Sequence, residues 1–372
     1  MQKHPNVKSE AESKLTSAYS ALEARICSGS WPVGAILPTE YELAAEFHCG
    51  RNTVSKAIAQ LVHEGFVERK RRAGTRVIRS SSNRKVSSMD LDAFAFIYPS
   101  EKHEGVRRII AGFQDEAYEA GQRSLLVPIG LDFRKKAEML GGLSESDVRG
   151  AVVYPVLLTP EDLIYYMQTI LACPFPVVLA GVSMIGAQRP TVVADGFHAG
   201  YTMTRYLLAQ GIRRIGYFGN YAWVCSGRDR YLGYRQAMDE AGLTDRNQDI
   251  CLEPSQHPNF EHPLDEPVQL AKRFLEKRPE IEGVVCASDF LAAGCLVAAR
   301  DMGLCIPSQL KVVGIDGFQS LPSDLQKLTS YRIPFEEIGR EAFATLVAAE
   351  NGKIEGTYEK LIRGDVVCGD SA

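Results

Sequence analysis

Arg51, Asn52 and Thr53 are three consecutive side chains whose chemistry suits the reading of base edges. A guanidinium can bridge O6 and N7 of guanine, an amide can pair with adenine, and a threonine methyl can meet the methyl group of thymine. The three residues open a stretch, residues 51–64, whose apolar side chains recur at helical spacing. The sequence therefore predicts a helix whose first turn presents polar side chains to the major groove of DNA.

A second group of cations, Lys70, Arg71 and Arg72, follows that helix. It lies between two short segments of strand-like composition, 66–69 and 75–78, so it is predicted to form the tip of a β-hairpin. Cations at such a tip can follow backbone phosphates or enter the minor groove. The hairpin adds a second basic DNA-contacting element beside the predicted helix.

Two further helices are predicted ahead of these elements. Apolar residues recur at intervals of three and four over residues 14–28, which indicates an amphipathic helix. A second helix is predicted from 38 to about 47, because Thr39 and Glu42 stand at capping-box spacing at its start. Three helices followed by a hairpin are the order of elements in a winged helix-turn-helix.

Several runs in this region resemble motifs of the GntR family of winged helix-turn-helix regulators, with the family's spacings over about residues 14–78: Leu37-Pro38-Thr39-Glu40, Arg51-Asn52-Thr53-Val54, Glu64-Gly65-Phe66-Val67-Glu68-Arg69 and Gly74-Thr75. The resemblance implies a DNA-binding domain at residues 1–78 that binds double-stranded operator DNA. It implies DNA contacts from Thr39, Glu40, Tyr41, Arg51, Asn52, Thr53, Ser55, Lys56, Lys70, Arg71, Arg72, Gly74 and Thr75. Tyr41 and Ser55 stand where the family commonly has arginines, so the family's usual operator is not assumed.

The charge is distributed unevenly along the 372 residues. Residues 1–88 carry 14 Lys and Arg against 8 Asp and Glu, whereas the remainder carries 28 against 38. A basic block on an acidic body indicates that the first part meets a polyanion and the rest does not.

Residues 79–92 are rich in serine and lack an apolar period, so we interpret them as a linker.

From 93 to 372, apolar strand-like segments alternate with amphipathic helices, which predicts an α/β fold with parallel sheets. Nine strands are many for one sheet, so we expect two lobes with a cleft, as in periplasmic binding proteins. The predicted strands are 93–98, 124–128, 150–154, 177–180, 191–194, 214–219, 283–287, 311–315 and 329–332. The predicted helices are 105–120, 133–143, 160–172, 198–210, 230–241, 267–277, 290–303 and 335–350.

Polar and aromatic side chains gather where these predicted strands end. Ligands of two-lobed α/β domains bind between the lobes at this edge of the sheets. Carboxylates and guanidinium groups pair with neighbouring hydroxyls, and aromatic rings stack on the apolar face of a sugar. The strand ends therefore predict a small-molecule site, suited to a monosaccharide or a derivative, that includes Glu101, Tyr154, Trp223, Asp289, Asp316 and Phe318.

Several runs between residues 93 and 367 look like the effector domain of the lactose-repressor (LacI) family, among them Val193-Ala194-Asp195, Arg228-Asp229-Arg230-Tyr231, Ala287-Ser288-Asp289 and Val313-Gly314-Ile315-Asp316. The resemblance implies a two-lobed effector domain at 93–372, an architecture similar to that of the arabinose repressor group. It makes Arg230 and Asp289, with Arg228, candidates for hydrogen bonds to the ligand. We expect Arg230 and Asp289 on facing walls of the cleft. Gly181 stands where the family often has an aspartate.

Other classes of function fit the sequence less well. An aminotransferase-like domain with pyridoxal phosphate, as in another GntR type, has about 290 residues available and no convincing lysine context. A solute-binding receptor would not begin with a DNA-binding domain. His257 and His262 suit a surface loop better than a metal site, and the sequence has no phosphate loop, HExxH or GxSxG motif. We expect a regulator and not an enzyme, without cofactor or metal.

The remaining features point to a cytoplasmic homodimer. Nine cysteines, none spaced as CxxC, are typical of reduced thiols. No apolar stretch is long enough to span a bilayer and no secretory signal precedes the first helix. A single short recognition helix needs a second half-site for useful affinity, which predicts a two-fold dimer.

Overall fold

The computed structural model divides the chain into two compact units, Met1–Met89 and Asp90–Ala372. It describes residues 17–26, 29–63, 65–70, 74–78, 92–130, 148–157, 159–184, 186–220, 225–243, 249–253, 259, 262–325, 327–354 and 356–372.

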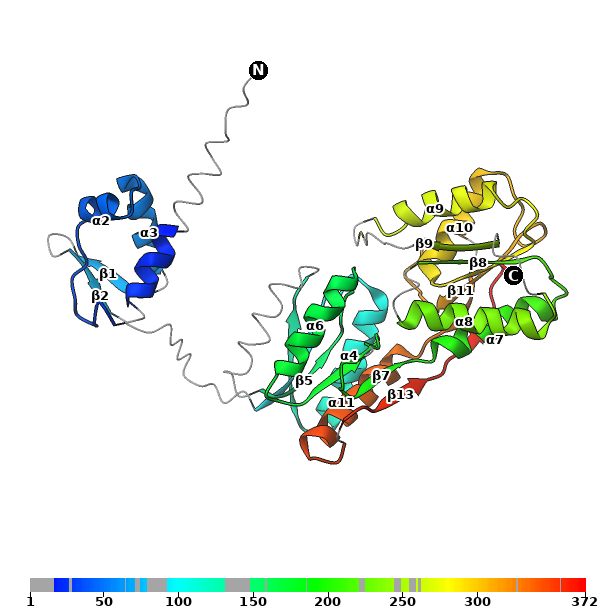
Figure 1. Cartoon of the computed structure of the whole chain (residues 1–372). Coiled ribbons are helices and arrows are strands. Elements are labelled where there is room, and N and C mark those ends of the chain that lie inside the picture. The colour runs from blue at the N-terminus through cyan, green and yellow to red at the C-terminus, as the bar shows by residue number, and fades with distance from the viewer. Residues whose placement is uncertain are drawn as a thin grey trace, which may run out of the picture. The chain divides into compact units, whose positions relative to one another are not determined.

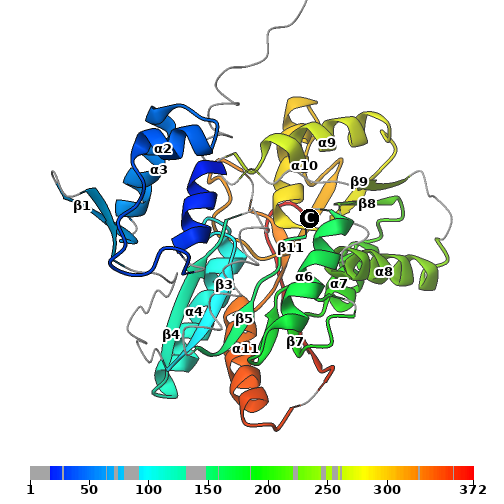
Figure 2. The same cartoon turned by 60° about the vertical axis from the view of Figure 1, so that its left-hand side comes forward.

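The described residues of the first unit form three helices and a two-stranded hairpin (Figure 2). Residues 17–26 are helical, and α2 and α3 follow as the two helices of the helix-turn-helix. The Thr39 hydroxyl accepts the Glu42 N–H and the Glu42 carboxylate accepts the Thr39 N–H, so the predicted capping box is present. A core that includes Leu22, Leu43 and Leu61 joins the helices. The labelled elements are α2 (Glu40–Glu46), α3 (Arg51–His63), β1 (Val67–Lys70) and β2 (Gly74–Val77).

The second unit begins with a lobe built on a six-stranded parallel sheet of order β13-β7-β6-β5-β3-β4 (Figure 1). The inner strands are buried on both faces because helices cover them, as their continuous apolar runs indicate. The elements are β3 (Ala93–Tyr98), α4 (Glu104–Glu119), β4 (Arg123–Pro128), β5 (Val148–Val153), α6 (Pro160–Ala172), β6 (Val177–Ala180), β7 (Thr191–Ala194), α11 (Phe335–Glu350) and β13 (Glu359–Ile362).

The other lobe is built on a sheet of order β14-β12-β11-β10-β8-β9, in which the β12–β14 pair is antiparallel and the other pairs are parallel. Its helices α7 and α8 pack against each other, as do α9 and α10. The elements are α7 (Gly196–Ala209), β8 (Ile215–Asn220), α8 (Cys225–Glu240), β9 (Ile250–Glu253), α9 (Asp265–Glu276), β10 (Gly283–Cys286), α10 (Asp289–Asp301), β11 (Lys311–Asp316), β12 (Thr329–Arg332) and β14 (Asp365–Val367).

The chain passes between the lobes after β7, after β12 and after β13. The second crossing returns α11 to the first lobe, where it packs along α4 although the two helices are far apart in sequence (Figure 1). This close packing needs glycine, because a Cβ at Gly112 would lie 1.9 Å from the backbone oxygen of Glu336. A Cβ at Gly339 would likewise lie 2.0 Å from the oxygen of Ile109.

The predicted α/β fold with two lobes and parallel sheets is confirmed, and three short strands were not predicted. These are β9, β13 and β14, which lie at sheet edges or carry charged side chains, so their sequences lack the apolar signal of the inner strands. The helix predicted at 133–143 and residues 79–91 of the predicted linker lie outside the described residues. None of the described helices is long and apolar enough to cross a membrane.

Candidate DNA-binding surface and effector cavity

The first turn of α3 presents Arg51 next to two residues of α2. Nε of Arg51 donates to the Glu40 carboxylate at 3.0 Å, and its guanidinium carbon lies 4.7 Å from the centroid of the Tyr41 ring. Nη1 of Arg51 also donates to the Tyr41 hydroxyl at 3.2 Å. The other oxygen of Glu40 accepts Nη2 of Arg69 from β1 at 2.6 Å. Glu40 therefore fixes the orientation of two arginines.

The electrostatics of Glu40 agree with that positioning role. Burial alone would raise its pKa, but hydrogen bonds from Arg51 and Ser55 and the charge of Arg69 bring the pKa below its ordinary value. Glu40 is thus a carboxylate that holds cations.

The other predicted DNA contacts lie around this cluster. Asn52 and Lys56 are exposed on α3, and Thr53 and Ser55 are half-buried. Thr39 caps α2. In the β1–β2 hairpin, which is the wing of this fold, Lys70, Gly74 and Thr75 belong to the paired strands. Lys70 forms an ion pair with Glu68 at 2.8 Å, and Gly74 has a φ of +83°. Arg71 and Arg72 lie outside the described residues.

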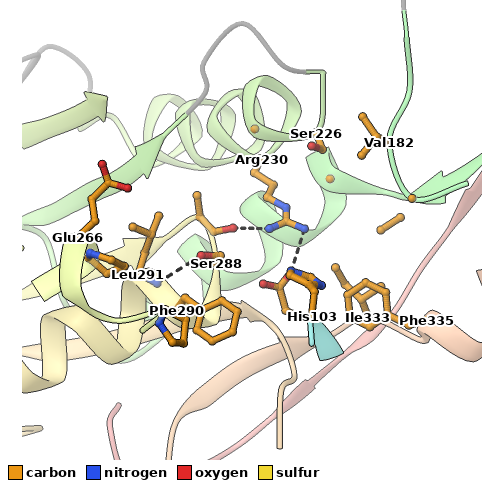
Figure 3. Close-up of a pocket in the computed structure, with 18 of the residues that line it drawn as sticks. His103, Val182, Ser226, Arg230, Glu266, Ser288, Phe290, Leu291, Ile333 and Phe335 are labelled. Atoms are coloured by element: carbon orange, nitrogen blue, oxygen red, sulfur yellow. Dashed lines mark hydrogen bonds and ion pairs between the residues drawn. The ribbon is translucent and has the colours of Figure 1, made fainter. Parts of the chain in front are cut away.

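A cavity of about 560 Å³ lies between the two lobes of the second unit. Its walls come from the carboxyl ends of strands in both sheets, with Tyr154 and Gly181 from one lobe and Ala287 and Asp316 from the other. Helix starts complete it, among them that of α8, which carries Arg230 (Figure 3). This is the position that an α/β domain offers to a ligand.

Arg230 and Asp316 form an ion pair in the wall of this cavity. Nη2 of Arg230 donates to Oδ1 of Asp316 at 3.1 Å, and Nη1 donates to the backbone oxygen of Ala287 (Figure 3). Nε of Arg230 is buried and has no hydrogen-bond partner among the described residues. Burial raises the pKa of Asp316 to about 6, although the charge of Arg230 works in the opposite direction.

Aromatic rings and His103 make up much of the remaining wall. The cavity is lined by Tyr154, Phe290 and Phe335, and the His103 ring packs edge-on to Phe290 at 6.2 Å between centroids. His103 also caps α4, since its Nδ1 accepts the Val106 N–H at 3.3 Å. Burial lowers the pKa of His103 to about 4, so the ring is neutral near pH 7 and its Nε2 carries the proton.

Asp289 does not line the cavity, contrary to the expectation from the sequence. Its carboxylate is 1% exposed and accepts the Phe318 N–H at 2.7 Å and the Ser330 hydroxyl at 2.6 Å. Asp289 and Arg230 also belong to the same lobe, on α10 and α8, so they cannot face each other across the cleft. The neighbouring residue Ser288 lines the cavity instead.

The other predicted effector residues are distributed as follows. Tyr154 and Asp316 line the cavity with Arg230. Phe318 is buried behind the wall and stacks on Phe335 at 5.8 Å between centroids. Neither Glu101 nor Arg228 is among the lining residues: Glu101 accepts the Tyr98 hydroxyl, and Arg228 pairs with Asp229 at 2.9 Å. Trp223 lies outside the described residues.

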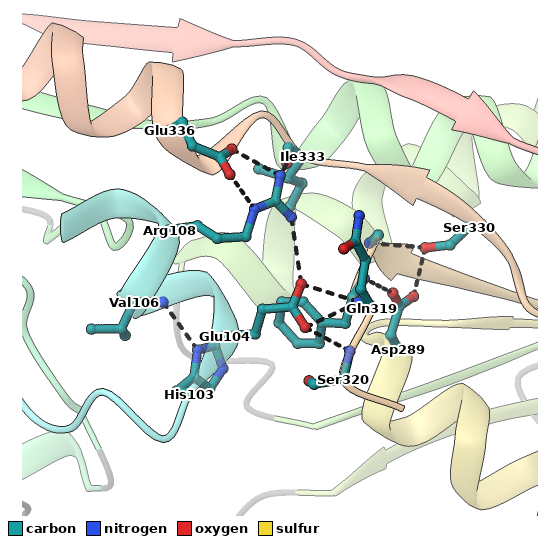
Figure 4. A network of polar contacts seen from close by, with 12 residues as sticks. His103, Glu104, Val106, Arg108, Asp289, Gln319, Ser320, Ser330, Ile333 and Glu336 are labelled. Atoms are coloured by element: carbon teal, nitrogen blue, oxygen red, sulfur yellow. Dashed lines mark hydrogen bonds and ion pairs between the residues drawn. The ribbon is translucent and has the colours of Figure 1, made fainter. Parts of the chain in front are cut away.

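A network of polar contacts joins the lobes beside the cavity (Figure 4). The carboxylate of Glu104, at the start of α4, accepts the N–H groups of Gln319 at 3.0 Å and Ser320 at 2.8 Å from the other lobe. Arg108, one turn further along α4, makes a two-fold contact with the Glu336 carboxylate at 2.7 and 2.9 Å. Glu104 thereby joins the start of α4 to the second lobe, and Arg108 joins α4 to the start of α11 within the first lobe.

Sequence reasoning missed several lining residues, including His103, Phe290, Phe335, Ser226, Glu266 and His262. His103 follows the predicted strand 93–98 by five positions, so a search of the whole loop after each strand would have found it. Phe335 comes to the cavity through the second crossing between the lobes, for which the local sequence has no signal. His262 is exposed and lines the cavity as well.

The two units match two different families. A model for the gntR family of bacterial regulatory proteins matches residues 15–77, and a model for periplasmic binding protein-like domains matches residues 204–372. The arabinose metabolism transcriptional repressor of Geobacillus stearothermophilus is 26% identical over 332 residues, which cover 87% of each chain. The transcriptional repressor PurR of Pectobacterium atrosepticum is 28% identical over 253 residues, covering 67% of this chain and 71% of that protein.

Solved structures share the same fold. The transcriptional regulator CelR, solved as a complex with cellobiose, has a TM-score of 0.66 and 21% identity, over 90% of this chain and 100% of that one. CcpA of Lactococcus lactis has a TM-score of 0.64 and 21% identity, over 75% of this chain and 99% of that one.

The fold and these matches define a transcription regulator, with a DNA-binding domain followed by a domain of the periplasmic-binding-protein type. The chain joins a GntR-type winged helix-turn-helix to a periplasmic-binding-protein-like domain. The alternative of an aminotransferase-like second domain is thereby overturned, because that part of the chain has the two-lobed fold.

Proposed function

We propose that the protein is a repressor whose affinity for operator DNA is controlled by an uncharged, polyhydroxylated small molecule, such as a sugar, in the cavity between the lobes. The observation that carries this proposal is the Arg230–Asp316 pair in the cavity wall. The guanidinium of Arg230, whose Nε has no partner among the described residues, and the carboxylate of Asp316 suit two neighbouring hydroxyls. The rings of Phe290 and Phe335 suit the apolar face of the same molecule.

The charges around the cavity favour a neutral ligand. Among the residues that line the cavity, Lys102 and Arg230 have basic side chains, whereas Asp265, Glu266 and Asp316 have acidic ones. The charge of Arg230 is balanced by Asp316, and the lowered pKa of His103 leaves that ring neutral at pH 7. A phosphate would lose its water on entering this cavity and would find no cluster of unpaired cations to replace it. Binding of a phosphate is therefore unfavourable.

The relatives support the same class of ligand and the same mode of action. One is an arabinose metabolism repressor, and a protein of similar fold was solved with cellobiose. A protein that binds chromosomal operators works in the cytoplasm of a bacterium, which is where we place this chain. The predicted two-fold dimer belongs to the proposal, since each DNA-binding domain offers one recognition helix.

Ligand contacts from both lobes provide the basis for control. A molecule that touches Arg230 in one lobe and Tyr154 or His103 in the other favours the arrangement in which both contacts form. It can alter DNA affinity only through its differential affinity for the arrangements of the effector domain. The ligand thus bridges Arg230 and residues of the opposite lobe. The sequence had instead indicated a bridge between Arg230 and Asp289.

Thermal-shift screening of the full chain tests the proposal. The panel holds neutral monosaccharides and disaccharides together with the phosphorylated form of each. We expect at least one neutral sugar to raise the melting temperature of the effector domain, and its phosphate to have a smaller effect. The same sugar must also change operator binding in a mobility-shift assay. Stabilisation by phosphorylated compounds alone would contradict the proposed ligand class.

A further inference from the structure

Tyr41 is a large aromatic residue on the surface that carries Arg51. Its side chain is 68% exposed, and its ring lies beneath the Arg51 guanidinium at 4.7 Å from the guanidinium carbon to the ring centroid. The Tyr41 hydroxyl accepts Nη1 of Arg51 at 3.2 Å. An exposed ring in contact with a cation is not explained by the core of this domain, because Tyr41 does not belong to that core.

The Arg51 side chain is held in one orientation by three contacts. Its Nε donates to Glu40, its Nη1 donates to the Tyr41 hydroxyl, and its guanidinium carbon lies 4.7 Å from the centroid of the Tyr41 ring. Among the described residues, Nη2 and one hydrogen of Nη1 have no acceptor, so they can donate to a base. A guanidinium fixed in advance loses less side-chain entropy when it binds, so this geometry favours a two-fold contact with guanine.

We propose that Tyr41 and Arg51 read one base-pair step as a unit, with Arg51 on a guanine and the Tyr41 ring on the 5-methyl group of an adjacent thymine. This inference rests on the proposal that the first turn of α3 enters the major groove. When Arg51 lies in the plane of guanine, a ring whose centroid is 4.7 Å from the guanidinium carbon lies within reach of the neighbouring step, since successive bases are about 3.4 Å apart along a strand. The thymine methyl is the apolar group that the major groove presents there.

The Tyr41 hydroxyl offers a rival role, because its hydrogen could be donated to a phosphate. Such a contact would carry no sequence information. The two roles separate by substitution, since Tyr41→Phe retains the ring and removes the hydroxyl, whereas Tyr41→Ala removes both. Both variants should fold, because the side chain is mostly exposed.

Selection from a randomised duplex library with the full-length protein supplies the test. Wild type, Tyr41→Phe, Tyr41→Ala and Arg51→Ala are compared, with Tyr118→Ala, an exposed tyrosine of α4, as the matched control. We expect wild type, Tyr41→Phe and the control to select a guanine with a neighbouring thymine. Tyr41→Ala should retain the guanine and lose the thymine preference, and Arg51→Ala should lose the guanine.

Replacing that thymine by uracil in a selected site removes only the methyl group. We expect wild-type affinity to fall about fourfold and Tyr41→Ala to be indifferent to the change. If Tyr41→Ala keeps the thymine preference, or if both Tyr41 variants weaken binding equally on all sequences, the inference is wrong while DNA binding stands. If wild type selects no sequence at all, the proposed function fails, and this inference fails with it.

Discussion

The Glu104 carboxylate accepts the Ser320 N–H at 2.8 Å, and these two residues belong to different lobes of the effector domain. The adjacent N–H of Gln319 donates to the same carboxylate at 3.0 Å, and the N–H of Phe318 donates to Asp289 at 2.7 Å. Three successive backbone N–H groups are thus bound by two carboxylates, one from each lobe (Figure 4). The segment 318–320 therefore connects the two lobes beside the cavity.

Glu104→Gln should weaken this connection. An amide can accept one of the two N–H groups with its oxygen, but its nitrogen would face the other, so we expect a loss of about 1–3 kcal/mol of stability in the effector domain. Hydrogen exchange at Gln319 and Ser320 should become faster. Glu119→Gln, an exposed glutamate on the same helix, is the control. Unchanged exchange at both amides would show that Glu104 does not hold the lobes together.

Asp289→Asn should change how stability depends on pH. Burial and then the charge of Asp316 raise the pKa of Asp289 to about 7, from an ordinary value of 3.8. A raised pKa in the folded state means that this carboxyl group contributes stability below about pH 4, which is lost as the pH rises through about 7. Asparagine does not titrate, so that loss is absent in the variant.

The measurement is the melting temperature of variant and wild type from pH 5 to pH 8. The melting temperature of the variant minus that of wild type should increase with pH. Groups that do not interact with Asp289, such as His103 with its lowered pKa, contribute equally to both proteins and cancel in this difference. Removing the Asp289 charge also removes its repulsion of Asp316, which changes the difference in the same direction. Asp239→Asn, an exposed carboxylate on α8, serves as the control. Parallel curves for Asp289→Asn and wild type would contradict the assignment.

Arg230→Gln and Asp316→Asn should reduce the response to a given concentration of effector and leave operator binding without effector intact. Both side chains line the cavity and neither belongs to the DNA-binding unit. Loss of a hydrogen-bonded charged partner should weaken effector binding by at least tenfold, which corresponds to about 1.4 kcal/mol. Arg228→Gln is the matched control on α8, since Arg228 pairs with Asp229 outside the cavity. Equal effects of Arg228→Gln and Arg230→Gln on calorimetric titrations would count against the cavity.

The proposed dimer should appear in sedimentation equilibrium. We expect a mass of twice 41.0 kDa at micromolar concentration, and a footprint on two half-sites with two-fold symmetry. Removal of one half-site should lower affinity strongly, because the second recognition helix then lacks its specific contacts. A monomer with full affinity for a single half-site would contradict this prediction.

Local sequence signals predicted the parts of the protein that depend on nearby residues. Thr39 and Glu42 stand three positions apart, so their capping box could be predicted, and the buried strand Ala93–Tyr98 has a continuous apolar run that marks it in the sequence. Strand β13 pairs with β7 from a distant part of the chain and carries charged residues, so the sequence contains no comparable signal.

The cavity likewise has residues that local sequence signals predict and residues that only the fold brings there. Arg230 and Asp316 could be placed near a strand end or helix start from their motifs, and both line the cavity. Phe335 arrives there through a crossing between lobes, which local patterns do not reveal. Asp289 stands at a helix start as well, but its side chain turns inward because Ser330 and the Phe318 N–H offer it hydrogen bonds. Position along the chain predicts which residues are near a site, and packing decides which of them face it.

Effector and operator are proposed to bind the same protein molecule with linked free energies. The most direct test is a calorimetric titration of the effector into the full-length protein, with and without a saturating amount of operator duplex. If effector weakens operator binding by some factor, operator must weaken effector binding by the same factor. We expect equal factors for wild type, and for Arg230→Gln a smaller effect of the same effector concentration on operator binding. Identical effector affinities with and without operator would contradict this linkage.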